Sequence, residues 1–117
     1  PGPYQIQAAI AACHAGPESD WGRIVLLYDR LLRLQPSPVV ELNRAAAVAM
    51  ADGPEAGLTE IDRIDGLDGY LHFHTARADL LRRLGRREES HAAYRRALDL
   101  EPSAAERRFI EGRLAST

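Results

Sequence analysis

Residues 73–85 read Phe-His-Thr-Ala-Arg-Ala-Asp-Leu-Leu-Arg-Arg-Leu-Gly, and the pattern of the whole chain can be read outward from them. This run predicts a helix over residues 70–84, because it is rich in helix formers and Gly85 suits the left-handed turn that ends a helix. A second helix is predicted over residues 87–100, and Pro102 ends it. One face of this second helix carries Tyr94, Ala97 and Leu98. Together the two segments predict a pair of helices joined by a tight turn.

Glycine, proline and capping residues divide the remaining sequence into five further helical segments. These are predicted over residues 4–15, 18–34, 38–51, 54–64 and 103–115. Ser37 is expected to cap the segment that follows it, and Ser103 with Glu106 forms a capping box before the last segment. Residues 65–69 are expected to be the most flexible loop. No strand pattern and no long linker is present, so the sequence predicts an all-α fold in a single domain over residues 1–117.

The composition is that of a globular, helical chain. Hydrophobic residues make up 45% and charged residues 27% of the 117 residues, which excludes wholesale disorder. The alanines of residues 38–51 are small enough for a neighbouring helix to approach closely. No apolar run approaches the roughly 18 residues of a membrane span, and the single cysteine excludes an internal disulfide. A net charge of −2 argues against a free-standing nucleic-acid binder, which should be basic.

The sequence offers no pattern typical of catalysis or of a bound metal or cofactor. The four histidines lack metal-site spacing, and His72 and His74 are two apart, so they point to different faces of a helix. Cys13 lies on an apolar stripe with no adjacent base, which favours a buried structural thiol. Arginines and acidic residues alternate after Asp79, which predicts an ion-paired surface. We therefore expect no catalytic, cofactor-binding or metal-binding residues and a protein that is not an enzyme.

The helix pair at residues 70–100 closely resembles a tetratricopeptide repeat (TPR). The matching positions are the turn glycine Gly85, the aromatic and alanine three apart, Tyr94 and Ala97, and the closing Pro102. Ser90 departs from the family, which has alanine there. The resemblance implies a right-handed, TPR-like helical solenoid of three helix pairs plus a C-terminal capping helix, because a single pair cannot bury its apolar face alone.

In a TPR-like stack the first helix of each pair lines the concave side, so the resemblance also implies a groove for a partner. The residues expected in this groove are Asn43, Arg44, Met50, His72, Thr75, Asp79 and Arg82. For Asn43 a buried hydrogen bond to a neighbouring turn is the equal alternative. The known clamp for a peptide carboxylate needs several lysines, and this chain has none. That mode of binding is therefore not expected.

A narrower resemblance covers essentially the whole chain. It rests on the stretches 2–12, 36–45, 52–58, 77–85 and 106–109, which occur in this order. Together they resemble the C-terminal TPR-like extension of a group of bacterial extracytoplasmic-function (ECF) sigma factors. The resemblance implies a cytoplasmic protein of transcription initiation, of which this chain is a C-terminal fragment without the DNA-binding domains. The implied partners are the sigma domains in cis and core RNA polymerase; promoter DNA is contacted only through the missing domains, and no membrane is involved.

Two other functions stay open at this point. A stand-alone TPR adaptor would capture a peptide of a partner protein through Asn43, Arg44 and Asp79. An enzyme subunit or thiol sensor would depend on Cys13, and slow, ordinary labelling of that thiol in the native state would dismiss it.

Overall fold

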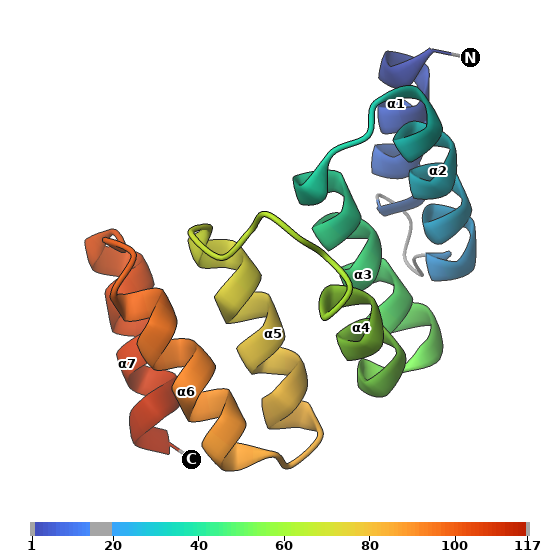
Figure 1. The fold of residues 1–117 in the computed structure, drawn as a ribbon. Coiled ribbons are helices and arrows are strands. Elements are labelled where there is room, and N and C mark those ends of the chain that lie inside the picture. The colour runs from blue at the N-terminus through green and yellow to red at the C-terminus, as the bar shows by residue number, and fades with distance from the viewer. Residues whose placement is uncertain (1, 15–19, 117) are drawn as a thin grey trace. The chain divides into compact units, whose positions relative to one another are not determined.

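The computed structural model describes residues 2–14 and 20–116, and over these residues the chain forms seven α-helices and no strand. Figure 1 shows them as α1 (Pro3–His14), α2 (Trp21–Leu34), α3 (Pro38–Asp52), α4 (Pro54–Ile61), α5 (Leu71–Arg83), α6 (Arg87–Leu98) and α7 (Ala104–Ser116). The predicted all-α fold is confirmed. The chain divides into two compact units, Pro1–Ile64 and Asp65–Thr117. Within the described residues, no helix has the length and apolar character needed to cross a membrane.

Side-chain caps fix the starts of several helices. Ser37 Oγ accepts from the backbone N–H three residues later at 3.4 Å, which opens α3. At α7, Ser103 Oγ accepts from the Glu106 N–H at 3.1 Å, while the Glu106 carboxylate accepts from the Ser103 N–H at 2.8 Å. Both predicted caps are confirmed. Asp20 caps α2 in the same way at 3.1 Å, and the predicted start of that segment at residue 18 lies outside the described residues.

Gly85 has a φ of 75° and turns the chain from α5 into α6, as expected.

Two helices, α4 and α6, end earlier than the sequence predicts. Helix α4 ends at Ile61 because the next turn of the chain is tighter than an α-helical turn. There the Ile64 N–H donates to the Ile61 carbonyl, three residues earlier, at 3.0 Å. Helix α6 ends at Leu98, where the Leu100 N–H reaches back three residues in the same way. The tightened turns still carry buried side chains, so the sequence pattern there looks helical.

The first unit buries an apolar core between α1, α2 and α3. Its buried members are Ile6, Ile10, Ile24, Leu27, Leu31 and Ala47. Helix α4 packs against α3 with almost no space between them, because both helices contribute small residues. A Cβ added to Gly57 would lie 2.4 Å from the Ala49 Cβ and 3.1 Å from the Ala45 carbonyl oxygen. Carbon atoms in ordinary contact are about 3.5–4.0 Å apart. The close approach predicted from the alanines is therefore confirmed.

The second unit is built on the α5–α6 pair, with α7 packed against α6. Tyr94 and Ala97 of α6 and Ala78 and Leu81 of α5 are at most 1% exposed. The hydroxyl of Ser90 is buried in this contact and donates to the Ala78 carbonyl at 2.8 Å. A serine can therefore replace the alanine of the TPR pattern here without leaving a buried polar group unpaired.

The loop at residues 65–69 is tied down on both sides. Nε2 of the buried His74 bonds the Asp68 carbonyl at 2.7 Å, and because a carbonyl only accepts, this nitrogen carries the hydrogen. The Arg96 guanidinium donates to the same carbonyl at 3.2 Å. Leu67 is only 6% exposed. The segment expected to be the most flexible loop is thus anchored to α5 and α6, through a histidine whose role is structural.

Candidate interaction surface

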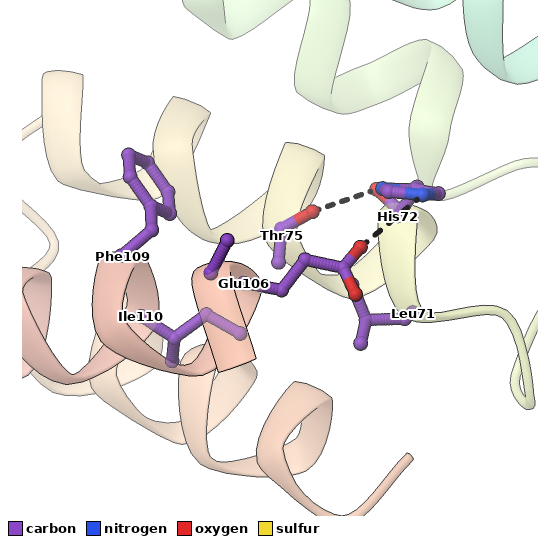
Figure 2. Close-up of a pocket in the computed structure, with 7 residues that line it drawn as sticks. Leu71, His72, Thr75, Glu106, Phe109 and Ile110 are labelled. Carbon is purple, nitrogen blue, oxygen red and sulfur yellow. Dashed lines mark hydrogen bonds and ion pairs between the residues drawn. The ribbon is translucent and has the colours of Figure 1, made fainter. Parts of the chain in front are cut away.

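An apolar hollow of about 340 Å³ opens between α5 and α7 (Figure 2). Its lining residues are Leu71, His72, Thr75, Ala105, Glu106, Phe109 and Ile110. Four of the seven are apolar, and the three polar residues come from the first two turns of the two helices. A concave apolar surface with a few polar groups at its edge is the usual form of a site that receives a side chain or small molecule.

The hollow stays open because α7 turns its aromatic residue outward. Ile110 is fully buried, whereas Phe109 is 53% exposed. Successive residues of a helix point about 100° apart, so packing one of them inward leaves the other at the edge. The Arg113 guanidinium lies 5.1 Å from the centre of the Phe109 ring, a cation–π contact that steadies the exposed ring. The sequence predicts that α7 is a capping helix. It does not predict that α7 also presents the exposed Phe109 ring at the hollow.

Polar contacts link the two helices at one end of the hollow. The His72 Nε2 and Glu106 Oε2 atoms are 3.7 Å apart, and a dashed line joins the two side chains in Figure 2. The Ser103 N–H bonds to the Glu106 carboxylate and lowers the pKa of Glu106, so this group is ionised at neutral pH. The Thr75 hydroxyl donates to the His72 carbonyl at 3.2 Å. The polar groups of the lining thus bond to one another, and the apolar surface between them is left uncovered.

Further along the same face of α5 lies a tight ion-pair cluster. The Asp79 carboxylate accepts from Arg82 at 2.7 Å and from Arg83 at 3.0 Å. The bond from Asp79 raises the pKa of Arg82. The Tyr94 hydroxyl is buried and has no hydrogen-bond partner among the described residues. Burial raises the pKa of Tyr94, and the nearby Asp79 carboxylate raises it further. Asp79 and Arg82 therefore hold each other, and neither is a free ligand group.

The first unit contains a separate hollow of about 310 Å³ between α1, α2 and α3. Its lining includes Asn43, which is exposed; among the described residues it does not form the buried hydrogen bond considered as its alternative role. Burial raises the pKa of Tyr28, which lines the same hollow. This hollow is more polar than the one in the second unit, because Gln7, His14 and Asn43 line it beside its apolar residues.

Arg44 ties three helices of the first unit together. Its Nε lies 2.6 Å from the Asp29 carboxylate of α2, and its NH1 nitrogen lies 3.4 Å from the Glu60 carboxylate of α4. The Arg44 side chain is only 24% exposed. Met50, in contrast, is 50% exposed. Arg44 therefore acts first as a structural link, and Met50 is an exposed apolar residue of α3.

The residues predicted for one groove thus fall into separate local surroundings. In the second unit, His72 and Thr75 line the α5–α7 hollow, and Asp79 and Arg82 form an ion pair further along the same face of α5. In the first unit all three residues come from α3: Asn43 lines a hollow, Arg44 forms the ion-pair link and Met50 is exposed. The full set is Asn43, Arg44, Met50, His72, Thr75, Asp79 and Arg82. A continuous groove that joins both groups stays a prediction.

Other residues considered for chemistry have structural surroundings. In the part of the chain that the structure describes, no group of three or more His, Cys, Asp or Glu side chains is placed to hold a metal ion. Cys13 is partly buried against the core of the first unit. Arg86 makes a two-bond contact to Glu89, at 3.0 and 2.8 Å, and lowers the pKa of that carboxyl. The ion-paired surface predicted for the arginine-rich region is confirmed at these positions.

Comparison with known proteins finds a relative but no family. No protein-family model matches the chain. Over 119 aligned residues the chain is 50% identical to an uncharacterized protein of Rhizobium meliloti (strain 1021). The alignment covers 97% of this chain but 28% of that protein. The chain therefore spans less than a third of the length of the curated relative that it matches.

Proposed function

We propose that this chain is a C-terminal regulatory domain of an ECF-type RNA polymerase sigma factor and acts in the bacterial cytoplasm. The observation that carries the proposal is the ordered set of stretches from residues 2–12 to residues 106–109, which resembles the extension of those factors over essentially the whole chain. The domain's role in this proposal is to bind protein, and it has no catalytic role.

The finer fold in this proposal is a right-handed, TPR-like solenoid of three helix pairs with α7 as the capping helix. Two features support it. Within each unit, every helix packs on the next one along the chain, as stacked helical hairpins do. The turn glycines Gly53 and Gly85 both have positive φ angles, 101° and 75°, and the repeat residues Tyr94 and Ala97 are both buried. Of these residues, Gly85, Tyr94 and Ala97 are positions on which the TPR resemblance rests.

The comparison supports the view of the chain as one part of a larger protein. In the Rhizobium relative the matching region is 28% of the length, so most of that protein consists of other sequence. In our proposal the corresponding other sequence of this protein holds the sigma domains that read the promoter and bind polymerase. Contact between those domains, or core polymerase, and the helical domain would set the rate of initiation.

Deletion of residues 1–117 from the full-length protein tests the proposal. We expect promoter-dependent transcription by the deleted protein with purified core polymerase to change, because the contact that regulates the sigma domains is gone. Equal amounts of folded protein must be compared, since a destabilised chain would also transcribe less. Unchanged transcription at equal protein levels would overturn the proposal.

The alternative function is a stand-alone TPR adaptor that binds a peptide of another protein, and the open α5–α7 hollow with its exposed Phe109 favours it. The DNA immediately upstream of the Pro1 codon separates the two functions. An open frame of roughly 200–300 further residues, one or two domains, with a helix-turn-helix near its end indicates the sigma factor. A start codon directly upstream indicates the adaptor.

A further inference from the structure

The lining of the α5–α7 hollow restricts what can fill it. Its apolar members are Leu71, Ala105, Phe109 and Ile110. Glu106 is the only acidic or arginine side chain in the lining. Its bond to the Ser103 N–H lowers the pKa of Glu106, so the carboxylate is negative at neutral pH. The hollow therefore suits a bulky apolar side chain that lies beside a positive charge.

The same domain presents such a pair of groups on its own surface. Among the described residues of the second unit, Phe109 is the one large apolar side chain that is exposed. The Arg113 guanidinium lies 5.1 Å from the centre of its ring. The two residues are one turn apart on α7, so they form a single element that is both apolar and positive. Figure 2 shows the Phe109 ring and the Glu106 carboxylate pointing away from each other.

A two-fold axis between two copies of the chain would bring this element and the hollow together. In such a pair the same surface of each copy contacts the other, so a residue near the axis lies beside its own counterpart. The two α7 helices would run antiparallel, which places the Arg113 end of one beside the Glu106 end of the other. Within one chain these two residues are two turns apart, about 10 Å along the helix. Their charges can therefore approach more closely between copies than within one.

From this arrangement we infer that the α5–α7 hollow is a contact between two copies of this chain, in which the Phe109 ring of each copy enters the hollow of the other and brings Arg113 to that copy's Glu106. A hollow of about 340 Å³ has room for one large side chain. A contact limited to one helix and one hollow is smaller than the roughly 800 Å² per partner of a standard interface, so the dimer is weak, with a Kd of about 0.1 mM. The inference goes beyond the proposed function and does not depend on it.

Sedimentation equilibrium of the 117-residue chain, from about 10 μM to about 1 mM, tests the inference. We expect the average mass to rise with concentration from that of one chain towards that of two, and to stop there. A two-fold contact closes on itself, so no larger species should form.

Two variants place the contact at the hollow. Phe109→Ala removes the ring, and because each substitution acts twice in a two-fold dimer, it should raise the Kd at least about tenfold. Ala105→Gln puts a longer polar side chain at an exposed position of the lining and should also weaken the dimer, without removing any packed group. Met50→Ala is the matched control, because Met50 is 50% exposed in the other unit, and it should leave the Kd unchanged. Circular dichroism shows whether each variant is folded.

A double-mutant cycle tests the charge pair between copies. Glu106→Gln removes the charge and keeps an oxygen that can accept from the Ser103 N–H, so the capping box can still form. Glu106→Gln and Arg113→Gln should each raise the Kd about threefold. Together they should raise it by less than the product of the two single effects, because each single change already breaks the same pair.

Three outcomes would overturn the inference. A chain that stays monomeric up to about 1 mM has no such contact. A dimer that Phe109→Ala and Ala105→Gln leave unchanged, or that Met50→Ala weakens equally, is formed by another surface. Single effects of Glu106→Gln and Arg113→Gln that simply multiply would show that these two residues do not pair between copies. The effect of deleting residues 1–117 on transcription tests the sigma-factor proposal separately and bears on none of these results.

Discussion

The contact between α3 and α4 allows a sharp test at Gly57. A methyl group added there should destabilise the protein, whereas the same change in an exposed helix usually stabilises it. In an exposed helix interior, Gly→Ala stabilises by about 1 kcal/mol, since alanine loses less backbone freedom on folding. At Gly57 the new Cβ would meet the Ala49 Cβ at 2.4 Å and the Ala49 Cα at 3.0 Å. Ordinary contacts need about 3.5–4.0 Å, so α4 has to move away from α3 by about 1 Å. Overpacking of this kind costs typically about 1–3 kcal/mol.

The clash outweighs the propensity gain, so we expect Gly57→Ala to lower the free energy of unfolding by up to about 2 kcal/mol. Gly112→Ala is the matched control, because Gly112 lies inside α7 and nothing lies within 4 Å of its added Cβ. It should raise stability by up to about 1 kcal/mol. Urea unfolding followed by circular dichroism measures both variants. If the two units unfold in separate steps, Gly57→Ala should shift only the step of the first unit.

A second substitution tests the cause of the destabilisation. Ala49→Gly removes the Cβ at 2.4 Å, so adding it to Gly57→Ala should recover part of the lost stability, beyond the sum of the two single effects. The recovery should be partial, because the Ala45 carbonyl oxygen still lies 3.1 Å from the new methyl group. A stabilising Gly57→Ala, or a double variant whose effects simply add, would refute the close-packing argument.

Three further changes give measurable effects. Ser90→Ala should cost about 1 kcal/mol in urea unfolding, because it removes a buried bond to the Ala78 carbonyl; no measurable loss would contradict the role given to that bond. Arg44→Met should cost about 1–2 kcal/mol, because it leaves the partly buried Asp29 carboxylate unpaired and leaves Glu60 with the more distant Arg63 alone, and the exposed Arg30→Met should cost far less. The folded-state pKa of Glu106 is lowered, so its contribution to stability is full above its ordinary pKa of 4.5 and is lost as the pH falls through the folded value. Between about pH 6 and about pH 3, Glu106→Gln should therefore lose less stability than the unchanged chain, and equal losses would show that the Ser103 bond does not matter.

The sequence predicts the helices well because their signals are local. Caps such as Ser37, the turn at Gly85 and the capping box at Ser103 depend on residues within one turn, and all three form as predicted. The early ends of α4 and α6 were not predictable in the same way. Apolar spacing continues past both ends, and it does not distinguish an α-helical turn from the tighter turn that replaces it.

The candidate site was predictable only in part, because it depends on contacts between helices. The face of α5 that carries His72, Thr75 and Asp79 follows from helical spacing alone. The contribution of α7 does not, since the spacing cannot say which of two adjacent apolar residues packs inward. The structure buries Ile110 and exposes Phe109. The tie from His74 to the Asp68 carbonyl was also beyond the sequence, because it joins a helix to an irregular loop.

The contrast between the two helix contacts explains why an apolar hollow stays open between α5 and α7. Between α3 and α4, glycine and alanine let the backbones meet at Gly57 and Ala49. Between α5 and α7, the facing residues include Leu71 and Phe109, and they leave about 340 Å³ open. Protein interiors are normally filled to the density of organic crystals, and a half-exposed aromatic ring beside an open apolar hollow departs from that rule. An apolar side chain placed in the hollow would bring the packing there closer to the density of a protein interior. The hollow is therefore one place on this domain where an apolar side chain of a partner would gain contact.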